Sequence, residues 1–233
     1  MRKGSSIIIT LMSALVIVLL YQLVSGEGTA SDRKAGMDVR SDKIRTLEYQ
    51  SETPYKVVID SGHGGKDNGA TGASGSFEKD FTLQVALKVE ELAKQEPGIE
   101  VVLTRSEDRF ISSIDRERPE IANRLGADLF ISIHGNTYED ASVSGTETYY
   151  YHEDSQFLAE IMQKHMVQTS GFRDRGVKKE DFFVLKDSNM PAALIEMGYL
   201  TNPQEENEML TEDYQYRMAS SILDGINEAL NLN

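Results

Sequence analysis

The chain of 233 residues contains no cysteine. This absence excludes disulfide bonds, thiol nucleophiles and metal sites built from thiolates. Any metal ion must therefore be held by histidine and carboxylate side chains, and the sequence offers only four histidines.

Positive charge is also scarce. Twenty-four lysines and arginines stand against 38 acidic residues, which gives a formal net charge of -14. Such a chain repels phosphate backbones, so nucleic acid is not expected as a partner. Internal repeats and low-complexity tracts are missing as well, which leaves no candidate for a repeat-based binding module. The 39% hydrophobic content is enough to bury the core of one globular domain.

The N-terminus has the pattern of an export signal or a membrane anchor. Arg2 and Lys3 precede an apolar run over residues 7–24. The run is longer than most removable signals and close to the length of a spanning helix, so residues 1–26 are a signal peptide or an anchor. The lack of an Ala-x-Ala cleavage site favours the anchor. Either alternative engages the membrane at least transiently and places the rest of the chain outside the cytoplasm.

Residues 27–54 are polar and glycine-containing and are predicted to be a linker, with one folded domain spanning 55–233. Within that domain, strand-like and helix-like segments alternate, which predicts a single α/β domain with a mostly parallel central sheet flanked by helices. The expected strands are 56–60, 99–104, 128–133, 146–151, 182–185 and 192–195. The expected helices are 81–92, 115–125, 155–169 and 213–230.

Two histidines follow buried strands of this predicted sheet. His63 lies in Ser-Gly-His-Gly-Gly and His134 in Ser-Ile-His-Gly-Asn, while Glu78 begins the first long helix. Each residue by itself is more often an ordinary turn or helix-start residue. Together, two imidazoles and a carboxylate at one edge of a sheet form the ligand set of a hydrolytic zinc site with its fourth position open.

Glu196 interrupts the apolar segment Ala-Ala-Leu-Ile-Glu-Met-Gly. Burial of a carboxylate without a partner costs several kcal/mol or raises its pKa. The residue is therefore either a functional group or a structural partner for a nearby arginine or backbone amide. His152 and His165 stand in polar surroundings and are predicted to be surface residues. The tyrosines at 149–151 either line a sugar-binding groove or pack against the sheet.

From about residue 56 to the C-terminus the sequence resembles the zinc-dependent N-acetylmuramoyl-L-alanine amidases, in particular their type 3 catalytic domain. The resemblance rests on four blocks in a specific order and spacing. They are residues 57–65, 78–80, 127–136 and 194–203. Arg118 also matches a family pattern, but no chemistry is assigned to it. Residues 176–185 match the strand and loop that border the cleft.

The resemblance implies one Zn²⁺ ion held by His63, Glu78 and His134, with Glu196 as the catalytic carboxylate. It implies hydrolysis of the amide bond between N-acetylmuramic acid and L-alanine in peptidoglycan, outside the cytoplasm, in cell-wall remodelling or autolysis. Two alternatives remain: a zinc peptidase that cuts within the murein stem peptide, and a non-catalytic wall-binding or regulatory protein. The loops after His134 and before Phe182 are too short for a helix that plugs the cleft, so an open cleft is expected. The sequence singles out no substrate-binding residue and no protein partner.

Overall fold

The computed structural model describes residues 53–232. The predicted signal or anchor at 1–26 and nearly all of the predicted linker at 27–54 lie outside the described residues. Within 53–232, no helix is both long and apolar enough to cross a membrane.

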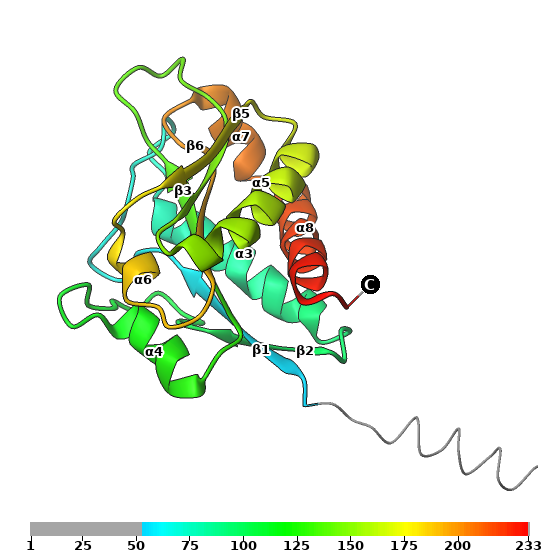
Figure 1. Cartoon of the computed structure of the whole chain (residues 1–233). Coiled ribbons are helices and arrows are strands. Elements are labelled where there is room, and N and C mark those ends of the chain that lie inside the picture. The colour runs from blue at the N-terminus through cyan, green and yellow to red at the C-terminus, as the bar shows by residue number, and fades with distance from the viewer. Residues whose placement is uncertain (1–52, 233) are drawn as a thin grey trace, which may run out of the picture. The chain divides into compact units, whose positions relative to one another are not determined.

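The fold is built on a 6-stranded sheet in the order β2-β1-β3-β6-β4-β5 (Figure 1). The strands are β1 (Tyr55–Ser61), β2 (Ile99–Leu103), β3 (Leu129–Asn136), β4 (Thr146–Tyr150), β5 (Asp174–Lys179) and β6 (Ala192–Tyr199). Neighbouring strands are parallel except β4 and β6, which are antiparallel. The predicted α/β class with a mostly parallel sheet is thus confirmed.

Helices cover the two faces of the sheet unequally (Figure 1). The long helices are α3 (Glu78–Ala93), α5 (Gln156–Ser170) and α8 (Glu212–Leu230). The short ones are α4 (Glu117–Leu125), α6 (Phe183–Lys186), α7 (Pro203–Met209) and the 3₁₀ turn η1 (Glu153–Ser155). Helices α3, α5 and α8 share the larger buried cluster, whereas α4 and α6 contribute to a smaller one.

The two clusters divide the strands residue by residue. Val57 and Ile59 of β1 point into the larger cluster, and Val58 between them points into the smaller one. This division follows from the alternation of side chains along a strand. On the face with the smaller cluster, the strand ends carry polar residues, and that face holds the candidate site.

Four details differ from the sequence-based prediction. Strand β5 is not among the strands expected from apolar runs, although residues 176–185 matched the family's strand and loop beside the cleft. Residues 182–185 were predicted to be a strand, but they form the start of α6, because a run of four apolar residues does not distinguish a buried turn of helix from a strand. Strands β3 and β6 are longer than predicted, so His134 and Glu196 lie within strands and not after them. Helix α7 was not predicted, although the Asn202 side chain caps it and Pro203 occupies its first turn.

Candidate active site

The loop after β1 presents His63 in a strained backbone conformation. Its φ is 61°, in the left-handed region that residues with a Cβ rarely adopt. Gly62 packs against the imidazole of His134, and a Cβ at this position would lie 2.4 Å from His134 Cε1. Glycine is therefore required here so that the backbone can approach the second histidine.

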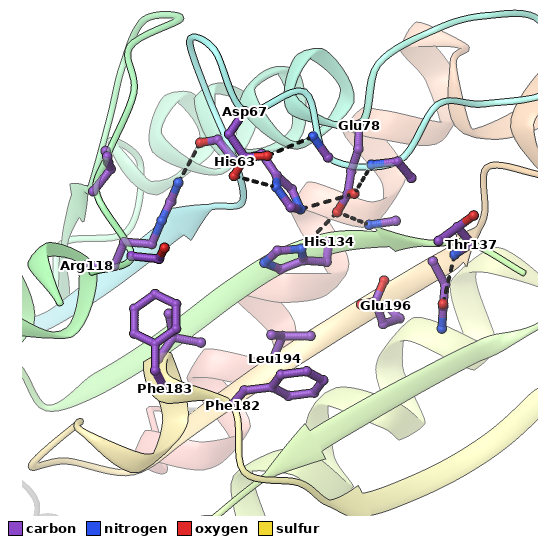
Figure 2. A pocket seen from close by; sticks show the side chains of 17 residues that line it. His63, Asp67, Glu78, Arg118, His134, Thr137, Phe182, Phe183, Leu194 and Glu196 are labelled. Carbon is purple, nitrogen blue, oxygen red and sulfur yellow. Dashed lines mark hydrogen bonds and ion pairs between the residues drawn. The ribbon is translucent and has the colours of Figure 1, made fainter. Parts of the chain in front are cut away.

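Glu78 joins the two histidines (Figure 2). Its Oε1 lies 2.8 Å from His134 Nδ1, and its Oε2 lies 3.2 Å from His63 Nε2. The three side chains each offer one ligand atom, and these atoms all lie within 4.8 Å of one another. Two imidazole nitrogens and one carboxylate oxygen at such separations fit the donor set of a hydrolytic zinc site.

Several contacts fix these side chains in place. The backbone amides of Ala70 and Gly135 donate to the Glu78 carboxylate at 2.8 and 3.1 Å. The other ring nitrogen of His63, Nδ1, lies 3.0 Å from Asp67 Oδ2. A carboxylate in this position orients a ligating imidazole and raises its basicity, as is common around metal sites.

Electrostatics at Glu78 favour its charged form. Burial by itself would raise the pKa of this carboxyl, but the hydrogen bonds with His134 and His63 outweigh burial and hold the pKa well below its usual range. An ionised, buried carboxylate between two imidazoles is suited to accept a cation in place of the histidine protons.

Glu196 is placed on the next strand, directly beside His134. The two residues are Cα partners in the parallel pair of β3 and β6, so their side chains share one face of the sheet. Glu196 Oε2 is buried and has no hydrogen-bond partner among the described residues. Burial, followed by the negative charges of Glu78 and Glu147, raises the pKa of Glu196 well above its usual value. The structural alternative, a partner for an arginine or a backbone amide, finds no support at this oxygen.

A cavity of about 500 Å³ connects these groups. Figure 2 shows the metal-ligand candidates on one side and apolar side chains on the other. The apolar wall includes Phe182, Phe183 and Leu194, and Ile111 and Val184 also line the cavity. Among the residues that line the cavity, the helical ones come from the starts of α3 and α4 and from the short α6. No long inserted helix takes part within the described residues, in agreement with the predicted open cleft.

Sequence reasoning did not identify the residues that support the site. Arg118 donates to Asp60 Oδ1 at 2.6 Å, to the Ser61 carbonyl at 2.7 Å and to the His63 carbonyl at 2.5 Å. Asp60 also accepts hydrogen bonds from Thr104 and Ser132. The match of Arg118 to a family pattern was the one available signal. It could not reveal that this arginine anchors the loop that carries His63.

The remaining histidines and tyrosines lie outside the cavity lining. His152 Nε2 contacts the Lys186 carbonyl at 2.9 Å, and His165 pairs with Glu228 at 2.7 Å. His165 is more buried than predicted because its side chain packs between α5 and α8. Tyr149 packs edge-on against Phe182, which does line the cavity.

The fold is an open α/β sheet, and His63, Glu78 and His134 bring together at its edge a set of donor atoms that suits a metal ion. The family model of the N-acetylmuramoyl-L-alanine amidases matches residues 57–228. The chain belongs to this family and is an enzyme of the peptidoglycan amidase class.

Individual relatives agree with this assignment. The structure of the catalytic domain of the amidase CwlV from Bacillus (Paenibacillus) polymyxa var. colistinus superposes with a TM-score of 0.74 and 45% identity, over 77% of this chain and 99% of that one. The probable cell wall amidase LytH of Staphylococcus aureus is 30% identical over 207 residues, 86% of this chain and 68% of LytH. The uncharacterized protein YqiI of Bacillus subtilis is 44% identical over 174 residues, 73% of this chain and 82% of YqiI.

Proposed function

We propose that this enzyme hydrolyses the amide bond between the lactyl group of N-acetylmuramic acid and L-alanine with one Zn²⁺ ion. His63, Glu78 and His134 hold the ion, and Glu196 acts as the general base. One observation carries the proposal: the unpartnered oxygen of Glu196 and the ligand atoms of the other three residues line the same cavity.

Glu196 is suited to move a proton. Its buried Oε2 can accept a proton without breaking an existing hydrogen bond. The raised pKa strengthens it as a base, provided that the carboxyl is ionised when substrate binds. It then returns the proton to the leaving alanine nitrogen. A zinc ion at this site supplies Lewis-acid activation of water and of the amide carbonyl.

Two supporting residues hold His63 in position. Asp67 orients the His63 ring, and Arg118 donates a hydrogen bond to the His63 carbonyl, so the strained turn keeps its conformation. The apolar wall that includes Phe182 and Leu194 lines the side of the cavity opposite the ligands and limits its water content.

The site of action follows from the same proposal. We place the enzyme outside the cytoplasm, where it acts on the cell wall in its remodelling or autolysis; the relative LytH is a probable cell wall amidase. The N-terminal segment at 1–26 would serve as the export signal or the anchor.

Muropeptide analysis after digestion of purified murein, with and without a chelator, tests the proposal. An amidase releases peptides with a free N-terminal alanine and leaves the sugar chain intact. Shortened stems that remain attached to sugar would instead identify a peptidase acting within the stem peptide. Absence of any product from metal-loaded enzyme would contradict the proposal.

A further inference from the structure

Beside Glu196 lies a charged cluster that the proposed chemistry does not use. Its centre is Glu147 on β4, which is the Cα partner of Glu196 across the antiparallel pair of β4 and β6. Cross-strand partners point to the same face, so His134, Glu196 and Glu147 form a row over three adjacent strands. Glu147 is buried, and Asn136 and the Tyr199 hydroxyl donate to its Oε1.

Two cations meet the other oxygen of this carboxylate. Lys178 Nζ and Arg175 Nε, both from the edge strand β5, donate to Glu147 Oε2. Their side chains remain 40% and 27% exposed, so part of each cationic group faces solvent. A lysine ammonium has three donors, and the contact with Glu147 occupies only one of them.

The cluster stands at the rim of the cavity. Glu147 holds Asn136, and the Tyr149 ring, which lies 5.7 Å from Lys178 Nζ, packs against Phe182. Asn136 and Phe182 both line the cavity. Lys178 therefore lies beside the cavity on the side of Glu196, away from the candidate metal ligands.

Charge makes this location distinctive. The cavity lining carries the carboxylates of Asp67, Glu78 and Glu196, and its one arginine, Arg118, is buried and engaged in three hydrogen bonds. The whole chain has a formal net charge of -14. Apart from the proposed Zn²⁺ ion, the lining offers an anionic group of a substrate no free cation, and Lys178 with Arg175 provides one beside it.

The direction of the substrate follows from the role of Glu196. Because this residue returns a proton to the leaving nitrogen, the released peptide begins beside it. We infer that the peptide then extends over β4 towards β5 and that Lys178, assisted by Arg175, binds a free carboxylate on its second residue. Strands are spaced by about 4.8 Å and an extended peptide advances by about 3.4 Å per residue, so two residues reach from Glu196 to the space above Glu147. This inference rests on the proposed function and specifies which substrates it favours.

A matched substrate pair tests the inference. N-acetylmuramoyl tripeptides are prepared in which the third residue is joined to the side-chain carboxyl of the second. The α-carboxyl of the second residue is either free or converted to the carboxamide, and kcat/KM is measured for both substrates. Charge-assisted hydrogen bonds predict a preference of about tenfold or more for the free acid, mainly through KM. The preference should shrink as salt concentration rises.

Substitutions on β5 test whether Lys178 causes the preference for the free acid over the carboxamide. Lys178→Gln should reduce the acid-to-amide ratio to near one, and Lys178→Arg should retain most of it because the charge is kept. Lys179→Gln is the matched control, since this adjacent lysine pairs with Glu153 and not with Glu147. Thermal unfolding of each variant checks that loss of the Lys178–Glu147 ion pair leaves the fold intact. The salt dependence of the acid-to-amide ratio is measured on the wild-type enzyme and needs no variant.

The outcomes are distinct. Equal kcat/KM for the two substrates, or an unchanged ratio in Lys178→Gln, overturns the inference and leaves the proposed function standing. Failure of the wild-type enzyme to cleave either substrate at the bond before alanine overturns the proposed function, and the inference with it.

Discussion

The two faces of the central sheet are built from the same strands but serve different ends. On the face covered by α3, α5 and α8, alternate residues such as Ile59, Ile131 and Ile195 are fully buried in one apolar cluster. On the other face, the residues between them become polar towards one end of the sheet, as at His134 and Glu196. A shift of one residue along a strand therefore separates packing from chemistry.

The two faces also differ in how their buried side chains affect the stability of the fold. Apolar side chains on the face covered by α3, α5 and α8 stabilise the fold because their burial removes them from water. Asp60 and Glu78 in the site are buried charges, whose desolvation is only offset by specific partners. Changes on the site face should thus affect activity more than stability, with the exception of the buried ion pair. The following substitutions test this contrast, from the largest expected effect to the smallest.

His134→Ala removes a ligand and should abolish both metal binding and turnover, while the fold is retained. Zinc content by mass spectrometry and release of dye from labelled murein measure the two effects. His165→Ala is the matched control, because this histidine pairs with Glu228 away from the cavity. Chelation of the wild-type enzyme should reproduce the loss, and added Zn²⁺ should restore activity. Full activity of the chelated enzyme would refute the metal requirement.

Glu196→Gln should lower kcat by about 10²–10⁴-fold, the usual contribution of a general base, and should keep the metal. The substitution keeps the shape of the side chain and removes a buried charge, so the melting temperature should not fall. Glu160→Gln on α5, outside the cavity lining, serves as the control. Near-normal turnover of Glu196→Gln would contradict the role proposed for this residue.

Arg118→Met leaves Asp60 buried and unpaired, which typically costs about 3–5 kcal/mol of unfolding free energy. It also removes the donor to the His63 carbonyl, so weaker zinc binding should accompany the loss of stability. Arg124→Met on the same helix, with a side chain 64% exposed, should change neither property. Urea unfolding and competition with a zinc chelator measure the two effects.

The same pair predicts a pH dependence. Burial tends to raise the pKa of Asp60, but Arg118, Thr104 and Ser132 outweigh it and lower the pKa below the usual 3.8. The contribution to stability is therefore complete above that value and is lost as the pH falls through the lowered pKa. In Arg118→Met, burial dominates and raises the pKa of Asp60, so protonation of this carboxyl as the pH falls should relieve the buried charge, and the difference in unfolding free energy from the wild type should shrink at low pH. Identical pH profiles from urea unfolding would contradict this account.

Leu158→Ala tests the opposite face. Leu158 of α5 is fully buried in the larger cluster, and its truncation should cost about 2–5 kcal/mol of stability. Activity per folded molecule should stay unchanged, because the side chain lies on the far side of the sheet from the cavity. A fall in kcat at a temperature where the variant is fully folded would break the separation between the two faces.

Asp67→Asn should have the smallest effect. The carboxylate orients His63 without being a candidate ligand, and loss of such a partner typically weakens metal binding by about 10–100-fold. Asp140→Asn, in an exposed loop, is the control. Zinc affinity by chelator competition distinguishes the two variants, and equal affinities would remove Asp67 from the site.

Part of this molecule could be predicted from the sequence because the signals are local. Apolar runs bounded by Pro and Gly marked most strands and helices, and the parallel order placed His63, Glu78 and His134 at one edge of the sheet. The structure brings these three side chains together, while their roles as zinc ligands, and that of Glu196 as base, stay predictions for the experiments above. Residues 182–185 were misjudged because four apolar residues carry too little periodicity.

The residues around the site depended on contacts between distant segments. Arg118 meets the His63 loop because α4 packs beside β1, and Glu147 meets Glu196 because β4 inserts antiparallel next to β6. Neither contact can be predicted from local sequence patterns, because the residues in contact lie far apart in the sequence. The sequence by itself determined the sheet, the family and the candidate ligands. Only the tertiary structure decided which charges surround Glu196. The neighbours of a buried carboxylate depend on the order of the strands in the sheet, which the hydrophobic pattern of each single strand does not determine.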